Sequence, residues 1–219
     1  MFKKILLGIG ALFFVLTGGL ILIMGYVFNN PDSVFNAFHS VTDKLMQGQK
    51  YEENGEFFLQ GISKLGFETR NVEIDVQTHN GPTLKVLLEG KVPRFEQGPF
   101  ILQTADSESV NIRFQEPLAS HWIQMNVNGQ EVTQDSNAKL KAHVYLPSSF
   151  KGHILISTRS GNIKLSLPEQ ELYELDLQTV SGKIDNTLVA KAAPGVSPDQ
   201  VGHIKVTSEE GSITVEPSR

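Results

Sequence analysis

Apolar and polar residues alternate through the second half of the chain, in three similar stretches. These stretches are ILISTRSGNIKLSL (154–167), LDLQTVSGKIDNTL (175–188) and IKVTSEEGSITV (204–215). A period of two places apolar side chains on one face of a strand and polar side chains on the other. In each stretch the apolar positions change parity at a glycine, as two turn residues led by glycine would produce. Each stretch therefore predicts a strand, a sharp turn and a second strand.

The turns centre on glycines that follow a Ser or Thr by three residues. An earlier segment, IDVQTHNG (74–81), resembles LDLQTVSG and is interpreted as a fourth copy. Glycine suits these turns because it accepts positive φ without a side-chain clash. The predicted structural turn glycines are Gly81, Gly161, Gly182 and Gly211.

Repeated strand–turn–strand units fit two all-β folds. One is a right-handed β-solenoid, or β-helix-like domain, and the alternative is an antiparallel β-sandwich of hairpins. Recurrence favours the solenoid, because stacked copies can lay one apolar row on the next and align Thr158, Thr179 and Ser208 as a polar ladder. No helical pattern occurs after residue 60, so residues 61–219 are predicted to form an all-β domain.

An uncharged apolar run occupies residues 5–28. As a helix rising 1.5 Å per residue it would reach roughly 36 Å, enough to cross a hydrocarbon layer of about 30 Å. The run is longer than the apolar part of a typical signal peptide and lacks an Ala-x-Ala site, which favours an uncleaved transmembrane helix. Lys3 and Lys4 precede it, so residues 1–4 are predicted to be cytoplasmic and the remainder to be exported.

Small residues recur every seven positions in this run, at Ala11, Gly18 and Gly25. They could form a helix-packing face through which the protein oligomerises, although glycine is common in spanning helices in any case. After the run, apolar residues at helical spacing predict an amphipathic helix over about 32–47. The polar stretch that follows is interpreted as a flexible joint, so residues 29–60 are expected to be a juxtamembrane helix and linker.

Charge and cysteine content exclude several classes of function. After residue 28 the chain holds 17 basic and 24 acidic residues, a formal charge of 17 − 24 = −7. This balance argues against nucleic-acid binding, which needs clustered Lys and Arg. The chain has no cysteine, so thiolate metal sites, disulfides and a cysteine nucleophile are all excluded.

Candidate chemical motifs are few. The histidines show no zinc-binding spacing, although His153 and His203 share a place in the repeat and would come to one edge if the copies stack. Ser148 and Lys151 match SxxK, the nucleophile motif of penicillin-recognising enzymes, but the SDN and KTG elements are missing. We therefore expect no catalytic residue, no metal and no cofactor, and predict that the protein is not an enzyme.

The run VYLPSSFKGHILISTRSGNIKL (144–165), a strand ending in Leu-Pro followed by T-x-S-G-x-I units, resembles the putative adhesin family of bacterial envelope proteins. The resemblance covers about residues 67–217. It implies a membrane-anchored or exported domain of β-helix-like form, and it brings no catalytic residues because none are known for that family.

These observations combine into one predicted organisation. The chain is expected to be a single-pass protein of the bacterial cytoplasmic membrane, with its β-repeat domain in the periplasm or outside the cell. There it would act as a non-catalytic binding, adhesin-like or scaffolding module. Its expected partners are the lipid bilayer and envelope proteins or glycans. The alternatives are an exported glycan-active enzyme and an accessory subunit of a membrane protein assembly.

Overall fold

The computed structural model describes residues 15–19, 48–117, 121–127, 130–135, 139–188 and 200–218. The chain divides into two compact units, residues 1–46 and 47–219. In the first unit residues 15–19 are helical, and no helix among the described residues has the length and apolar character needed to cross a membrane. The rest of the predicted span lies outside the described residues, as does the predicted helix over 32–47.

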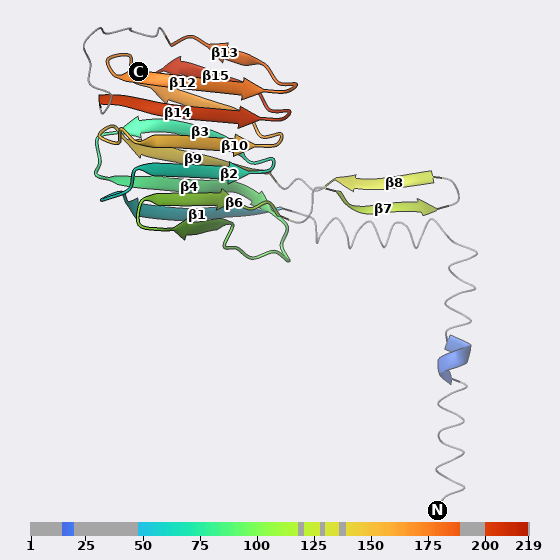
Figure 1. The fold of residues 1–219 in the computed structure, drawn as a ribbon. Helices are drawn as coiled ribbons and strands as arrows, with labels where there is room; N and C mark the ends of the chain where they lie inside the picture. The colour runs from blue at the N-terminus through green and yellow to red at the C-terminus, as the bar shows by residue number, and fades with distance from the viewer. Residues whose placement is uncertain are drawn as a thin grey trace, which may run out of the picture. The chain divides into compact units, whose positions relative to one another are not determined.

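The second unit is built from strands (Figure 1). Their bounds in chain order are β1 (Gln49–Phe58), β2 (Lys64–Thr69), β3 (Glu73–His79), β4 (Thr83–Val92), β5 (Ile101–Ala105), β6 (Ser109–Phe114), β7 (His121–Val127), β8 (Gln130–Asp135), β9 (Lys139–Pro147), β10 (His153–Thr158), β11 (Ile163–Leu167), β12 (Leu172–Thr179), β13 (Ile184–Asn186), β14 (Val201–Ser208) and β15 (Ile213–Pro217). The prediction of an all-β domain is therefore confirmed.

The strands form two large mixed sheets and one hairpin. Sheet A has the order β1-β4-β9-β3-β11-β15-β13, and sheet B has the order β12-β14-β10-β2-β6-β5. The third sheet is the antiparallel pair β7-β8. Pairing is parallel through the middle of both large sheets and antiparallel where β1, β4, β9 and β5 join. Neither large sheet closes on itself.

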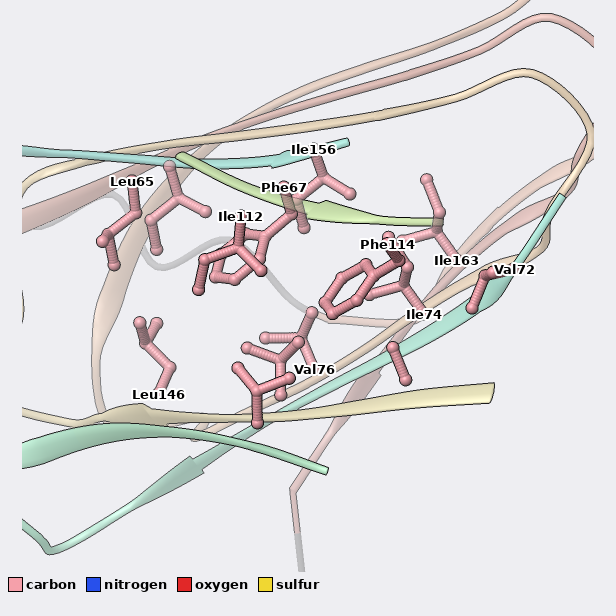
Figure 2. Close-up of a cluster of buried hydrophobic side chains, with 14 of the residues drawn as sticks. Leu65, Phe67, Val72, Ile74, Val76, Ile112, Phe114, Leu146, Ile156 and Ile163 are labelled. Carbon is pink, nitrogen blue, oxygen red and sulfur yellow. The ribbon is translucent and has the colours of Figure 1, made fainter. Parts of the chain in front are cut away.

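The two large sheets share one apolar core. Phe67, Ile112 and Phe114 point from sheet B toward the side chains of sheet A, as Figure 2 shows. The rings of Phe67 and Phe114 lie nearly parallel, with centroids 6.5 Å apart. Ile74 and Val76 meet them from β3 and are almost fully buried. Alternation thus places one face of β10, β11, β14 and β15 in this core, as the sequence pattern predicted, whereas the end strand β13 leaves Ile184 exposed.

Each sequence repeat places its two strands in different sheets. β10 lies in sheet B and β11 in sheet A, and β12/β13 and β14/β15 follow the same rule. We call such a B strand, its turn and its A strand a rung. Rungs stack in parallel and in register, so that Ile154 and Leu175 both align with Ile204. Because the two strands of a repeat do not pair with each other, the repeats are not hairpins.

The rungs do not stack in the order in which the chain makes them. From one end, the order is β12/β13, β14/β15, β10/β11 and β2/β3, so the last repeat lies between two earlier ones. A solenoid that coils regularly along the sequence is therefore not shown. What the structure does show is coarser: two mixed sheets whose central parts are parallel and stacked.

The predicted linker ends earlier than expected, because β1 occupies residues 49–58 where a flexible joint was predicted. Its alternation is hard to see in the sequence because Glu53 is one of the residues on its half-buried face. The Glu53 carboxylate accepts hydrogen bonds from the Tyr51 hydroxyl at 2.7 Å and from the backbone N–H of Phe100 at 2.7 Å. A carboxylate satisfied in this way can occupy a position where an apolar residue would be expected.

Candidate functional site

Three of the predicted turn glycines form a column along the stack of rungs. A Cβ added to Gly182 would lie 2.1 Å from the carbonyl oxygen of Gly211, and one on Gly211 would lie 2.1 Å from that of Gly161. A Cβ on Gly161 would in turn lie 2.2 Å from the carbonyl oxygen of Val72. These positions admit only glycine without a backbone shift, because each turn passes directly over the next.

Hydroxyl groups join the turns into a ladder. The N–H of Gly161 donates to the Thr158 hydroxyl oxygen at 3.0 Å, and the N–H of Gly182 does the same to Thr179 at 3.0 Å. The Thr179 hydroxyl donates onward to the carbonyl oxygen of Gly211 at 3.1 Å. The Thr158 hydroxyl likewise donates to the carbonyl oxygen of Arg70 at 3.2 Å. The hydroxyl group of each threonine thus accepts a hydrogen bond within its own turn and donates one to the neighbouring rung.

The fourth rung corrects the alignment of the fourth copy. Its turn is Thr69–Val72, where the N–H of Val72 donates to the Thr69 hydroxyl oxygen at 3.2 Å. Gly81 instead lies between β3 and β4, away from the glycine column, and its N–H donates to Nδ1 of His79 at 3.0 Å. The sequence alignment missed the fourth turn because Val72 occupies the place that glycine holds in the other three.

A cleft of about 1020 Å³ opens where the B strands reach these turns. We call it the corner cleft. Its walls come from the ends of β2, β6 and β10, the start of the turn after β14, and the loop before β5. The lining residues are Glu68, Thr69, Arg70, Glu96, Gln97, Pro99, Phe100, Arg113, Phe114, Gln115, Glu116, Ser157, Thr158, Arg159 and Glu209.

One wall of the corner cleft is an ordered group around Glu68. Asn111 donates from Nδ2 to Oε1 of Glu68 at 3.0 Å, and the Arg113 guanidinium donates to Oε2 from Nη2 at 2.9 Å and from Nε at 3.2 Å. The hydrogen bond from Asn111, followed by that from Arg113, lowers the pKa of the Glu68 carboxyl below its usual value. Glu68 is therefore a fixed carboxylate acceptor at neutral pH.

Two arginines from neighbouring rungs form the next part of the wall. The carbonyl oxygen of Arg70 accepts the N–H groups of Arg159 at 3.1 Å and Ser160 at 2.8 Å, which places Arg70 and Arg159 side by side. Nε of Arg159 lies 3.4 Å from a carboxylate oxygen of Glu209. Arg70 is an exposed residue of the cleft lining, and within the described residues its guanidinium has no ion-pair partner.

A second carboxylate, that of Glu116, holds the part of the cleft wall next to Arg70 through hydrogen bonds. Glu116 accepts hydrogen bonds from the backbone N–H of Asn71 at 2.5 Å and from Nδ2 of Asn71 at 2.7 Å. Ser160 on the next rung bonds to Oδ1 of Asn71. These contacts link the segments that directly follow β6, β2 and β10, so the cleft wall is held together by neighbouring strands of sheet B.

The corner cleft is suited to binding a polar ligand. Its lining includes the buried residues Phe100 and Phe114 together with residues that carry guanidinium, carboxylate and amide groups. Among the described residues no group of three or more His, Asp or Glu side chains is arranged to hold a metal ion. Guanidinium groups donate hydrogen bonds, carboxylates accept them and amides do both, so this lining favours recognition of a ligand rich in hydroxyl or amide groups.

The SxxK motif does not assemble into a site. Lys151 Nζ lies 2.5 Å from the Glu171 carboxylate and 5.7 Å from the centre of the Tyr173 ring. The Ser148 hydroxyl contacts Asn80 at 3.4 Å instead. Burial, together with the hydrogen bond to Glu171, raises the pKa of the Tyr173 phenol above its ordinary value. These contacts give Lys151 a packing role at the start of β12.

The remaining predicted residues are placed in part. His153 and His203 come together, with ring centroids 4.8 Å apart. Gly18 lies in the helical residues 15–19, and among the described residues no atom lies within 4 Å of the position that a Cβ on Gly18 would take. Ala11 and Gly25 lie outside the described residues. The arginines of the corner cleft were missed from sequence, although Thr-Arg at the start of two turns (69–70 and 158–159) was a usable signal.

Comparisons with known proteins leave the family open. No family model matches the chain, and no curated protein matches it. A crystal structure of a putative cell adhesion protein from Clostridium sporogenes aligns over 77% of this chain and 100% of that chain, with 11% sequence identity and a TM-score of 0.42. At that identity and TM-score the similarity assigns neither a family nor a function, so the resemblance to the putative adhesin family stays a prediction.

Proposed function

We propose that this chain is a single-pass protein of the bacterial cell envelope that binds a ligand in the corner cleft without catalysing a reaction on it. Residues 5–28 would anchor it in the cytoplasmic membrane, with the β-domain in the periplasm or outside the cell. The length and lack of charge of that run support the anchor, and Lys3 and Lys4 support the orientation. Ala11, Gly18 and Gly25 are the proposed face for oligomer formation.

The corner cleft is the observation that carries the proposed binding role. Five segments of the chain supply its walls, and hydrogen bonds between neighbouring segments hold Glu68, Arg113 and Glu116 in place before any ligand arrives. Side chains ordered in advance lose little conformational freedom on binding, which favours affinity. The parallel rungs also support our proposal that the domain is a right-handed, solenoid-like scaffold with a permuted rung order.

We propose a glycan strand of the cell wall as the ligand. The corner cleft contains three arginines and four glutamates, so its charges nearly balance and do not select a strongly charged ligand. Sugar hydroxyl and acetamido groups donate and accept hydrogen bonds, which matches the mixed guanidinium, carboxylate and amide lining. An exported domain tethered to the cytoplasmic membrane would also have the cell wall within reach.

Hydrolysis of such a glycan is the alternative that the proposal rejects. Glycosidases use two carboxyl groups, one of which must keep its proton near neutral pH through a raised pKa. Glu68 has the opposite property, because its hydrogen bonds lower the pKa of its carboxyl. Incubating the protein with cell-wall glycan should release no reducing ends, and release that Glu68→Gln abolishes would establish an enzyme instead.

Co-sedimentation with purified cell-wall sacculi tests the binding proposal. The full-length protein, in mild detergent, should pellet with sacculi, and the double variant Arg70→Ala/Gln115→Ala should bind at least about tenfold more weakly. That factor follows because one hydrogen bond to a charged group contributes roughly 1.5–3 kcal/mol and about 1.4 kcal/mol is tenfold in affinity.

Lys183→Ala provides the matched control. Lys183 is an exposed cation in a turn of the same stack and does not line the corner cleft. Its removal should leave co-sedimentation unchanged. Failure of the wild-type protein to pellet with sacculi would reject the glycan, and equal pelleting of the wild type and the double variant would reject the cleft as its site.

A further inference from the structure

A second candidate site lies on the outer face of sheet B, formed by His153 and His203. The parallel pairing of β10 and β14 aligns His153 directly with His203. Side chains aligned on neighbouring strands start about 4.8 Å apart and point to the same side of the sheet. Both follow a glycine and precede an isoleucine that enters the core, so the two rungs present their imidazoles in the same way.

The two imidazole rings are stacked. Their centroids lie 4.8 Å apart and their planes differ by 24°. The His153 residue is exposed, and the His203 side chain keeps 31% of its accessible surface.

Glu174 orients the second histidine. β12 pairs with the other side of β14 and aligns Glu174 with His203, whose Nδ1 lies 2.8 Å from a Glu174 carboxylate oxygen. A neutral imidazole that donates from Nδ1 to a carboxylate presents its Nε2 as an acceptor. This carboxylate–histidine pairing is the arrangement that fixes the tautomer of metal-ligating histidines in proteins.

We propose that His153 and His203 together bind a divalent transition-metal ion, with Glu174 as the positioning residue. Metal–nitrogen bonds of about 2.0–2.1 Å require two ligating nitrogens roughly 3 Å apart. In the stacked pair the ring centroids are 4.8 Å apart, so binding a shared ion requires the exposed His153 ring to turn about its side-chain bonds toward Nε2 of His203. Water fills the other coordination positions, and among divalent ions Cu²⁺ binds most tightly to such imidazole ligands.

The neighbouring charges are consistent with a site of moderate affinity. Lys64 aligns with His153 on the side away from His203, so one end of the row is positive. Glu174 provides a negative charge at the other end. The site is separate from the corner cleft, whose lining includes neither histidine. The test of the histidine site is therefore independent of the proposed glycan binding.

Copper titration of the full-length protein, purified without a histidine tag, tests this site. Electron paramagnetic resonance at one equivalent of Cu²⁺ should show two equivalent nitrogen ligands. His153→Ala and His203→Ala should each abolish the two-nitrogen signal and weaken binding strongly. Glu174→Gln should weaken binding by about 10- to 100-fold, as loss of an outer-shell carboxylate does in other metal sites.

His143→Gln is the matched control, because it removes an imidazole from the outer face of sheet A. The two-nitrogen signal should persist in this variant. If instead each single variant of the pair loses only half of the bound copper and leaves the affinity of the remainder unchanged, the histidines bind independently and the proposal is overturned. A wild-type spectrum with one nitrogen ligand would overturn it as well.

Discussion

Gly182 lies over the carbonyl oxygen of Gly211, leaving 2.1 Å between that oxygen and the position a Cβ would take. The same relationship joins Gly211 to Gly161 one rung further along the stack. Glycine is needed here because of close backbone approach between turns that are distant in sequence. The column formed by Gly161, Gly182 and Gly211 is therefore a tertiary feature. It fixes the spacing of the turns beside the corner cleft.

Gly211→Ala tests the column. The added methyl group would meet the carbonyl oxygen of Gly161, and relief of that clash requires a backbone shift in a well-packed stack. We expect a loss of about 1–3 kcal/mol in the free energy of unfolding, as for other overpacked sites. Chemical denaturation followed by circular dichroism measures it.

Val180→Ala is the control for that substitution. Val180 lies in the turn of the end rung and is 85% exposed. Its truncation should change stability by less than about 0.5 kcal/mol, as is usual at the surface. Equal effects of the two variants would show that the turns are loosely packed.

Thr158→Val tests the hydroxyl ladder. The substitution keeps the shape of a 4% exposed side chain but removes the acceptor for Gly161 N–H and the donor to the Arg70 carbonyl. A buried N–H left without a partner costs about 1–3 kcal/mol, so the variant should be destabilised by that amount. Thr214→Val, a half-buried position in β15, should have little effect on thermal or chemical unfolding. A Thr158→Val variant as stable as the wild-type protein would show that the hydroxyl ladder does not stabilise the stack.

Stability should depend on pH through Glu68. Its folded-state pKa lies below the ordinary value of 4.5 because of the hydrogen bonds from Asn111 and Arg113. A depressed pKa means that the ionised group stabilises the folded state above about pH 4.5, and that this contribution disappears as pH falls through the lower folded value. The difference in unfolding free energy between wild type and Glu68→Gln should therefore shrink as pH falls below 4.5.

Arg113→Gln provides the internal check on the pH effect. With the guanidinium removed, the pKa of Glu68 should move closer to 4.5, and the pH-dependent difference should become smaller. Urea denaturation at several pH values measures both variants. A difference between wild type and Glu68→Gln that stays constant from pH 7 to pH 3 would contradict the assignment.

Much of the fold could be predicted because the alternation of apolar and polar residues in the repeats indicates which side chains are buried. Ile154, Ile156, Ile204 and Val206 alternate as expected and are all buried. Rung order could not be predicted, because any repeat can stack on any other when their apolar rows and turns are alike. β1 was missed for a different reason, since Glu53 satisfies its carboxylate through tertiary contacts that no local pattern reveals.

The candidate site was less predictable than the fold. Arg70 and Arg159 are far apart in the sequence and become neighbours only because β2 and β10 pair in parallel. Glu68 and Arg113 meet for a similar reason across β2 and β6. The histidine pair was anticipated, since identical places in two repeats become adjacent once the repeats stack.

The most direct test of the corner cleft places a photo-crosslinking amino acid at Gln115, an exposed residue of the cleft lining, in the full-length protein in intact cells. The same substitution at Asp185, which is exposed on β13 and does not line the cleft, serves as the control. Irradiation should join cell-wall glycan to the Gln115 variant and leave the Asp185 variant unmodified. Equal labelling at both positions, or labelling at Asp185 alone, would contradict the assignment of the cleft as the binding site.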